Sequence, residues 1–345
     1  MQERDSGVQD SDSMRRRSGA DAVCVHTVGP DRGVARPSLV PWAVLCVVLL
    51  AWIGGSGCSL LRRYAVDQFA NAVAHSDTTL ASEEDPELVR TAAPFNLKLL
   101  EGLLAESPQH QGLLSAAASG FTQYAFAFVQ QDADELEARD LAAAEALRTR
   151  AKRLYLRARN YGLRGLAVNH PGFPNALLTD PRAAVRATTT ADVSLLYWTA
   201  AGWAAAISLS ADNPELIAQI PAMEALMDRA LELDERYHRG AIHTFLITYE
   251  MSRQGAAGDP AARARAHFER AMALAEGTSA APLVALAEAV AVRQQDLKGF
   301  ESLLNRALAM NPDVNPDTRL LNLVMQRRAR WLLSRKADLF LIEEE

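Results

Sequence analysis

Apolar positions recur along the chain at helical spacing, and a small residue between apolar neighbours marks several of the helices that they predict. The phrase Arg306-Ala307-Leu308 returns as Arg270-Ala271-Met272, Arg229-Ala230-Leu231 and Arg164-Gly165-Leu166, and in looser form at Gly102. A small residue with apolar neighbours one turn away lets two antiparallel helices approach closely. The last copies are spaced near the ~34-residue period of tetratricopeptide helix pairs. The pattern therefore predicts an internal repeat of helical hairpins.

The predicted fold class is all-α, a tetratricopeptide-like helical-hairpin solenoid of about five helix pairs plus a C-terminal capping helix. Ala and Leu are abundant, while alternating Val, Ile and Thr runs are nearly absent after the N-terminus. The predicted pairs are 61–80 with 87–105, 112–130 with 136–168, 193–209 with 215–233, 237–252 with 260–275, and 281–293 with 297–310, and the predicted cap is 317–334.

Some positions interrupt this regular pattern. Asp85-Pro86-Glu87 predicts a helix start, with an acidic N-cap, proline in the first turn and a carboxylate near the positive end of the helix dipole. Pro94 then predicts a kink or two short helices, because proline lacks the backbone N–H. The charged first half of the helix at 136–168 predicts projection into solvent. Residues 171–190 have no clear period and predict an irregular insertion.

The N-terminal residues predict a leader that precedes the helical body. Residues 1–37 are polar and aperiodic, which fits either a disordered extension or a start codon assigned too early. Leu39–Ile53 is apolar, shorter than the ~20 residues of a spanning helix and within the length of a signal-peptide core. We therefore assign 38–57 to a lipoprotein signal peptide and 58–345 to a single α-helical repeat domain.

Small residues and Cys58 follow the apolar run, and this segment resembles a bacterial lipobox. In a lipobox a diacylglycerol is attached to the cysteine thiol and the signal peptide is cut before it, so the resemblance implies lipidation at Cys58. Gly55 stands where leucine is usual. Ser59 after the cysteine implies an outer-membrane address in a Gram-negative cell. The alternative is a short membrane anchor with an unmodified cysteine.

Composition narrows the classes of partner. The formal charge of −6 argues against nucleic acid, because a nucleic-acid surface needs clustered Lys and Arg. The chain is 49% hydrophobic, which is enough for a large core that grows along the repeats.

The cysteines of the chain are Cys24, Cys46 and Cys58. Removal of the signal peptide leaves one thiol, so no intrachain disulfide is expected.

One predicted helix, Val193–Leu209, is almost free of charge. It carries Tyr197, Trp198 and Trp203 among Ala and Gly residues. Large rings beside small residues fit either a central core helix or the lining of an apolar cavity. Both interpretations stay open at this stage, because one helix face looks like the other when both are apolar.

The sequence carries no pattern typical of a catalytic, metal or cofactor site. His238 and His243 are not spaced to place two ligands on one helix face, and no HExxH, CxxC, glycine-rich phosphate loop or GxSxG pattern occurs. We therefore expect no metal, no cofactor and no enzymatic activity. His243 is expected to be a satisfied core histidine, and Asp192 and Glu250 are expected to be solvated or capping residues.

Several segments together resemble one family. They are Lys152–Ala158 with Tyr161-Gly162-Leu163, Leu195–Trp198 with Ala204-Ala205, Gly240–His243 with Tyr249-Glu250, and Ala264–Ala271 with Gln295-Asp296 and Phe300–Leu304. Over about residues 58–340 the chain resembles the T-component lipoproteins of tripartite ATP-independent periplasmic (TRAP) transporters. The resemblance implies a periplasmic, tetratricopeptide-like protein that is lipid-anchored to the outer membrane and assembles as a homotrimer.

The resemblance also implies a role. The family is proposed to partner the periplasmic substrate-binding protein of a TRAP transporter and to pass a hydrophobic ligand through an apolar channel in each subunit. The candidates for lining this channel are Tyr197, Trp198, Trp203, Phe245 and Tyr249. The alternative is a tetratricopeptide scaffold lipoprotein for outer-membrane assembly or peptide binding. It ranks second because the chain lacks the Asn-rich clamp that such peptide readers tend to carry.

Overall fold

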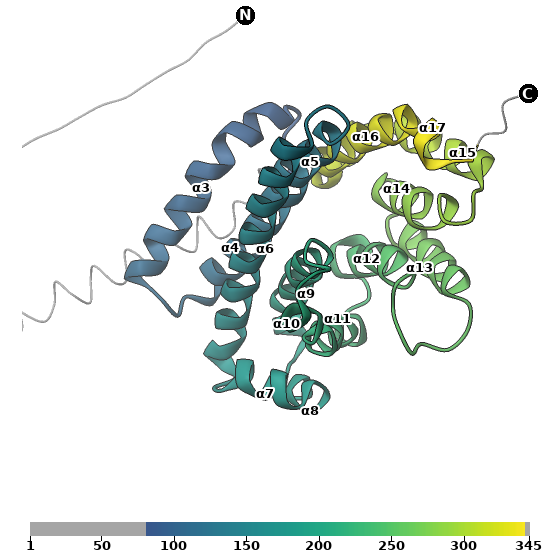
Figure 1. The fold of residues 1–345 in the computed structure, drawn as a ribbon. Helices are drawn as coiled ribbons and strands as arrows, with labels where there is room; N and C mark the ends of the chain where they lie inside the picture. The colour runs from purple at the N-terminus through teal and green to yellow at the C-terminus, as the bar shows by residue number, and fades with distance from the viewer. Residues whose placement is uncertain (1–80, 342–345) are drawn as a thin grey trace, which may run out of the picture. The chain divides into compact units, whose positions relative to one another are not determined.

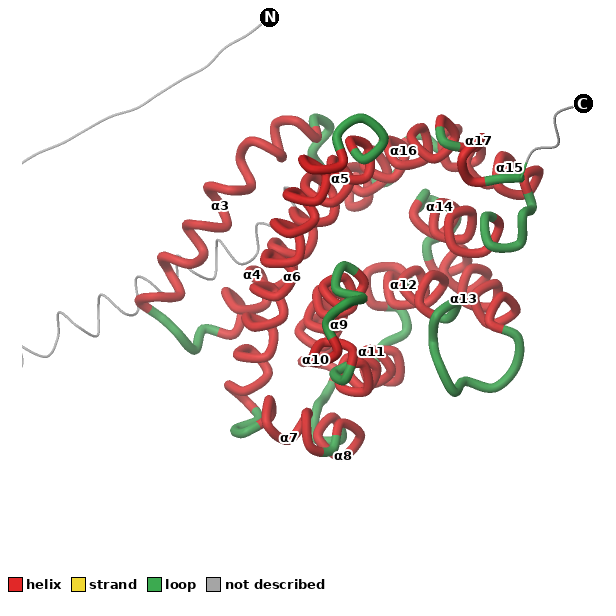
Figure 2. The backbone as a smooth tube through the Cα atoms, in the orientation of Figure 1, coloured by secondary structure: helices red, strands yellow, loops and turns green. Residues whose placement is uncertain are grey.

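The computed structural model describes residues 81–341, which form helices joined by turns and contain no strand (Figure 1, Figure 2). The all-α prediction is confirmed for these residues. Two π-helical turns occur, Ala125–Gln130 between α4 and α5 and Ala287–Ala291 after α14. The α-helices are α3 (Pro86–Glu106), α4 (Gln111–Tyr124), α5 (Gln131–Leu136), α6 (Leu141–Asn169), α7 (Phe173–Thr179), α8 (Pro181–Val185), α9 (Val193–Ser208), α10 (Pro214–Ile217), α11 (Ile220–Leu233), α12 (Ala241–Tyr249), α13 (Pro260–Leu274), α14 (Ala281–Leu286), α15 (Leu297–Ala309), α16 (Arg319–Ser334) and α17 (Lys336–Leu339).

Several predictions concern residues outside this range. They are the extension 1–37, the signal peptide 38–57, the lipidation site Cys58 and the first helix, 61–80. Within residues 81–341, no helix is both long and apolar enough to cross a membrane.

α3 begins where the sequence predicts. The Asp85 carboxylate accepts a hydrogen bond of 2.9 Å from the backbone N–H of Glu87, and Pro86 stands in the first turn. Of the two outcomes predicted at Pro94, a kink or two short helices, the second is not found, because α3 continues through Pro94 as one helix. Proline removes a single N–H, and buried side chains on both sides of Pro94 hold the helix against its neighbours. These are Val89, Ala93, Leu97, Leu100 and Leu104.

The boundary predicted at Leu136 is displaced. α4, the π-helical turn and α5 continue to Leu136, and α6 starts only at Leu141. The start is set by Asp140, whose carboxylate accepts a hydrogen bond of 3.0 Å from the backbone N–H of Ala143. The first half of α6 packs against α5 and buries Ala144, so the predicted projection into solvent is wrong. The small side chain of Ala144 allows this packing, although charged residues surround it.

Residues 171–190, predicted to be irregular, contain α7 and α8. α7 buries Phe173 and Leu177 in the same cluster as Leu166 of α6. α8 packs against α11 and buries Val185. Helices this short have too few turns to show an apolar period, so the sequence pattern carried no signal for them.

Consecutive helices pack on one another along the chain. α6 contacts both α4 and α9, and α9 contacts α11. Farther along, α12 contacts α13 and α14, while α15 contacts α14 and α16. This order places α9 in the interior and the α11–α12 connection beside it. The tetratricopeptide form of the solenoid stays a prediction.

The recurring small residues mostly lie where helices approach closely. Ala230, Ala271 and Ala307 have no exposed surface, and Gly165 is buried. A Cβ built on Gly165 would lie 2.6 Å from Cδ2 of Leu195 and 3.3 Å from Cβ of Leu114, so a larger residue at this position would force the Leu195 side chain to shift. Gly102 is the exception, because it is exposed and an added Cβ would meet no atom within 4 Å.

α16 packs on α14 and α15, as expected of a capping helix, and also reaches the N-terminal helices α3 and α5 (Figure 1). Arg327 donates hydrogen bonds from Nη2 to Asp132 at 2.8 Å and to Glu135 at 2.7 Å. Arg328 donates to Asp134 at 3.0 Å. The sequence did not predict these ion pairs, which join residues almost 200 positions apart.

Candidate functional site

Two of the channel candidates lie in one cluster of rings. Tyr197 and Trp198 of α9 meet Tyr237 and His238, which belong to the turn between α11 and α12. The ring centroids are 4.9 Å apart for Tyr197 and Trp198, 5.3 Å for Tyr197 and Tyr237, and 6.5 Å for Trp198 and His238. All four residues are partly or largely exposed. The cluster therefore presents aromatic surface where α9 meets the α11–α12 connection.

The turn that carries Tyr237 and His238 has an unusual backbone. His238, Arg239 and Gly240 are consecutive residues with φ values of 42°, 55° and 88°. The left-handed region costs a non-glycine residue about 1–2 kcal/mol, so the surroundings must hold this conformation. A Cβ on Gly240 would lie 3.1 Å from Cβ of Leu274, which makes glycine the fitting residue there. Strained residues cluster at functional sites, so the turn qualifies as a candidate.

Hydroxyl groups connect this turn to the helices behind it. The Tyr237 hydroxyl donates a hydrogen bond of 3.1 Å to Oγ of Ser194 on α9. Ser194 Oγ lies in turn 3.0 Å from Oγ of Ser115 on α4. The Tyr237 ring is therefore held by hydrogen bonds as well as by ring contacts.

Phe245 and Tyr249 form a second aromatic group on α12. Their rings stack with centroids 5.6 Å apart, and both side chains are partly buried against the same apolar cluster as Tyr197. The Tyr249 hydroxyl donates a hydrogen bond of 2.7 Å to Oε1 of Glu224. Burial, and then this hydrogen bond, raise the pKa of Tyr249 well above its usual range.

Trp203 lies apart from both groups, in the core. It is 1% exposed, and its indole N–H donates a hydrogen bond of 3.1 Å to Oε1 of Gln219. The Arg159 guanidinium covers the ring at 5.1 Å from its centroid. The structure thus distributes the predicted channel residues over separate places: the ring cluster, the stacked pair on α12 and the buried Trp203.

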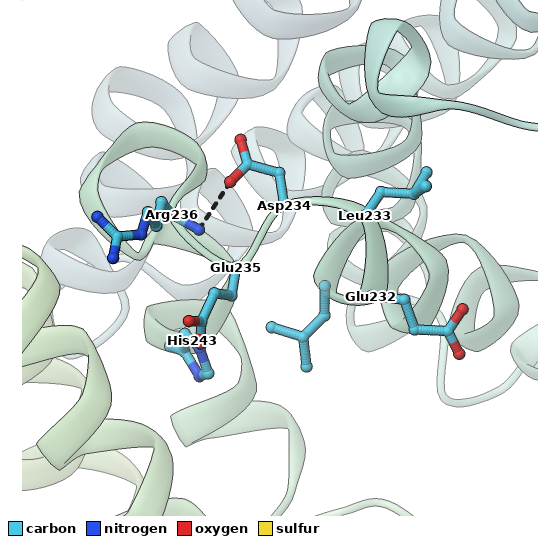
Figure 3. A pocket seen from close by; sticks show the side chains of 7 residues that line it. Glu232, Leu233, Asp234, Glu235, Arg236 and His243 are labelled. Atoms are coloured by element: carbon cyan, nitrogen blue, oxygen red, sulfur yellow. Dashed lines mark hydrogen bonds and ion pairs between the residues drawn. The ribbon is translucent and has the colours of Figure 1, made fainter.

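An open hollow of about 500 Å³ lies beside the aromatic turn (Figure 3). None of the channel candidates lines it. In Figure 3, Glu235 lies next to His243, and Asp234 accepts a hydrogen bond of 2.9 Å from the backbone N–H of Arg236. The lining residues are Leu231, Glu232, Leu233, Asp234, Glu235, Arg236 and His243.

His243, in the wall of this hollow, pairs with a second histidine. Its Nδ1 lies 2.8 Å from Nδ1 of His267 on α13, a distance at which one nitrogen donates its proton to the other. Its Nε2 lies 3.5 Å from Oε2 of Glu235, too far for a good hydrogen bond. The expectation of a satisfied core histidine is therefore confirmed for burial and for Nδ1, but not for Nε2.

Charge around this pair is balanced by Arg270. Its Nε donates a hydrogen bond of 3.0 Å to Glu235, and this guanidinium lowers the pKa of the Glu235 carboxyl to about 2. Burial lowers the pKa of both His243 and His267 below the usual value. Both imidazoles are consequently neutral at pH 7, since their ordinary pKa is already about 6.5.

The two carboxylates singled out in the sequence differ in environment. Asp192 caps a helix as expected, accepting a hydrogen bond of 2.9 Å from the backbone N–H of Thr189. Glu250 is not solvated, because it is 4% exposed and accepts hydrogen bonds from Arg253 at 3.0 Å and Arg263 at 2.5 Å. Arg263 comes from a different helix, so sequence spacing could not reveal this pairing.

Sequence reasoning missed most of the polar site. Glu235 lies in the α11–α12 connection, whereas His267 and Arg270 lie one turn apart on α13, and no spacing rule connects these two residues with Glu235. The only available signal for the turn was Tyr237-His238 shortly before a glycine. Among residues 81–341, no group of three or more His, Cys, Asp or Glu side chains could hold a metal ion.

Fold and site together define an all-α protein of successively packed helices that exposes aromatic rings at one helix connection. Comparison with known families identifies which one it is: the family described as TRAP transporter T-component matches residues 82–340. The chain belongs to this family. Its membership places the protein with TRAP transport as an accessory, in agreement with the resemblance seen in the sequence.

A relative from Treponema pallidum (strain Nichols) is 29% identical over 316 residues, which covers 86% of this chain and 98% of the relative. It is described as an uncharacterized protein.

Proposed function

We propose that this chain is a lipid-anchored periplasmic accessory protein of a TRAP transport system and has no enzymatic activity of its own. Cys58 carries the lipid at the outer membrane, the helical body binds the periplasmic substrate-binding protein, and three copies assemble. A hydrophobic ligand passes through an apolar channel in each subunit. The observation that carries this proposal is the family match over residues 82–340, which spans nearly all of the described body.

The aromatic groups support a role in handling an apolar ligand. Tyr197 and Trp198 are only partly buried and lie beside a turn held in a strained conformation. Phe245 and Tyr249 are likewise only partly buried. Rings of this kind bind apolar molecules by burial and stacking. In this proposal Trp203 supports the channel wall from the core.

An exposed apolar stripe on α3 supports assembly. Leu88 is 55% exposed and Phe95 is 75% exposed, and Ala92 and Leu99 continue the stripe at helical spacing. Contiguous apolar surface of this kind is typical of association sites. We assign this face of α3 to contact between copies of the chain.

Native mass spectrometry of the protein extracted gently from its own membranes tests the proposal. A lipidated trimer that carries a periplasmic binding protein or an apolar ligand is the expected result. An unliganded monomer bound to outer-membrane assembly factors would instead favour the scaffold alternative. A measured mass without the lipid would show that Cys58 is unmodified and would contradict the lipid anchor.

Alanine substitution of Trp198 tests the channel itself. Loss of the co-purified ligand with an unchanged circular dichroism spectrum and melting temperature is expected. Phe340 provides the control, because it packs on Phe300 in a different cluster, where a Phe340→Leu change leaves ligand binding intact. Retention of the ligand by Trp198→Ala would show that Trp198 is not needed to hold the ligand in the channel.

A further inference from the structure

α5 and the turn that joins it to α6 carry several carboxylates, and each of them is already engaged. Asp132 pairs with Arg90 and Arg327, Asp134 with Arg148 and Arg328, Glu135 with Arg327, and Glu137 with Arg148. Asp140 caps α6 through the backbone N–H of Ala143. None of these carboxylates is therefore left to neutralise a further cation.

Two arginines nearby lack such a partner. Arg139 in the α5–α6 turn and Arg330 on α16 are exposed, and neither side chain has a hydrogen bond or ion pair with any of residues 81–341. Both line one hollow of about 320 Å³, although they are far apart in the sequence. Two guanidinium groups around one small space repel each other, and an anion between them would remove that repulsion.

A third arginine of the hollow has donors to spare. Arg327 makes its ion pairs with Asp132 and Glu135 through Nη2 alone, so the N–H groups on Nε and Nη1 are not used by these contacts. These pairs also hold the guanidinium in a fixed position. The hollow therefore combines one oriented and two unpartnered arginines in a chain whose formal charge is −6.

The other residues that line the hollow indicate which kind of molecule should carry the anionic group. Trp331 is partly buried, and its ring is held by the guanidinium of Arg328 at 5.0 Å and of Arg335 at 5.8 Å from the centroid. It offers an apolar wall next to the arginines. Glu135 also lines the hollow and repels a doubly charged phosphate more strongly than a singly charged carboxylate.

We propose that this hollow binds a carboxylate attached to an apolar or aromatic body. The carboxylate accepts paired hydrogen bonds from Arg139 and Arg330, a geometry that the planar guanidinium favours, and the body lies against Trp331. The carboxylate belongs either to a small organic acid or to an acidic side chain of a partner protein. This site is separate from the aromatic cluster and does not depend on the transport proposal.

Isothermal titration calorimetry on the full chain in detergent tests this site, with benzoate, a triglutamate peptide and inorganic phosphate as probes at low salt. Benzoate binding that weakens about tenfold or more in Arg139→Gln/Arg330→Gln is expected if the source is a small acid. Binding of triglutamate alone, with the same loss, assigns the carboxylate to a partner protein. The matched control is Arg182→Gln/Arg186→Gln, which removes two exposed arginines near α8 and should change nothing.

Three results would overturn the proposal. They are no binding of either carboxylate probe, binding of phosphate alone, and equal weakening in the control variant. Arg330→Lys provides a further check because it keeps the charge but loses the paired hydrogen bonds. It should weaken benzoate binding while leaving the melting temperature unchanged, and unchanged binding would argue against recognition by Arg330.

Discussion

Trp203 and Trp198 lie on the same helix but differ in burial. Trp203 is 1% exposed and hydrogen-bonded to Gln219, whereas Trp198 is only partly buried. Trp203→Ala should lower the free energy of unfolding by ~3–5 kcal/mol, because it leaves a cavity in the core and removes the hydrogen bond to Gln219. Trp198→Ala should cost clearly less. Urea denaturation of both variants measures the two losses in the free energy of unfolding. Similar losses would contradict the interpretation that Trp203 lies in the core and Trp198 does not.

The His243–His267 pair predicts a pH dependence of stability. Burial lowers the folded-state pKa of both imidazoles, so below pH ~6.5 the unfolded chain binds more protons than the folded chain. Stability is therefore fully present above the unfolded pKa and falls as the pH drops from there toward the folded pKa. Urea midpoints measured between pH 7.5 and 5 should decline, and they should decline less steeply in His243→Gln. Equal slopes in both proteins would contradict this origin.

At the scale of helix pairs, small residues set how close two helices lie. A Cβ on Gly162 of α6 would lie 1.9 Å from Oγ1 and 3.3 Å from the backbone Cα of Thr199 on α9, whereas one on Gly102 meets nothing. Gly162→Ala should therefore destabilise the fold by ~1–3 kcal/mol through overpacking. Gly102→Ala is the matched control and should stabilise it by up to ~1 kcal/mol, since alanine favours the helix. Thermal unfolding distinguishes them, and a neutral Gly162→Ala would show that α9 can move away.

Ion pairs decide how α16 is attached to the rest of the body. Arg328 is 8% exposed and joins Asp134 of α5 to Glu288, which follows α14. Arg328→Ala removes the close partner of Asp134 and of Glu288 and leaves the partly buried Asp134 with only Arg148, at 3.7 Å, so a loss of ~3 kcal/mol is expected. Lys336→Ala, which removes the exposed pair with Glu301, should cost less than ~1 kcal/mol. Amide hydrogen exchange of α16 would localise the effect. Unchanged protection of α16 in Arg328→Ala would contradict the role of Arg328 in attaching this helix.

At the scale of the whole molecule, the exposed face of α3 predicts a change of assembly. Phe95→Asp places a charge in the stripe that we assign to contact between copies and should dissociate the oligomer without unfolding the chain. Lys98→Asp, on the exposed part of the same helix but outside the stripe, is the control for added charge. Light scattering at several concentrations measures both variants. A Phe95→Asp protein with the oligomer mass of the wild type would show that the copies do not associate through this face of α3.

Helix positions could largely be predicted because apolar period and capping residues act locally. Asp85 and Asp140 both accept hydrogen bonds from the N–H groups of the turn that follows them, but the chain around Asp140 has helical composition on both sides. Only the first of these starts was recognised. At Pro94 the two predicted short helices form one helix, because packing of the buried face of α3 outweighs one missing hydrogen bond.

The candidate site could be predicted only in part. The rings at Tyr197 and Trp198 stood out because α9 has no charge around them. Their partners Tyr237 and His238 did not, since the left-handed turn that presents them depends on packing between Gly240 and Leu274. The neutral pair of His243 with His267 was hidden for the same reason, because each residue alone looks like an ordinary helix position.

The sequence by itself determined that the body is helical, that small residues allow its helices to pack closely, and which family the chain resembles. These properties follow from local periodicity and composition, which are readable along the chain. The tertiary structure decided which apolar rings stay partly exposed, which charges pair across the fold, and that Arg139 and Arg330 line one hollow. Such properties depend on contacts between distant residues, and an apolar or charged position looks the same in the sequence whether or not the fold gives it a partner.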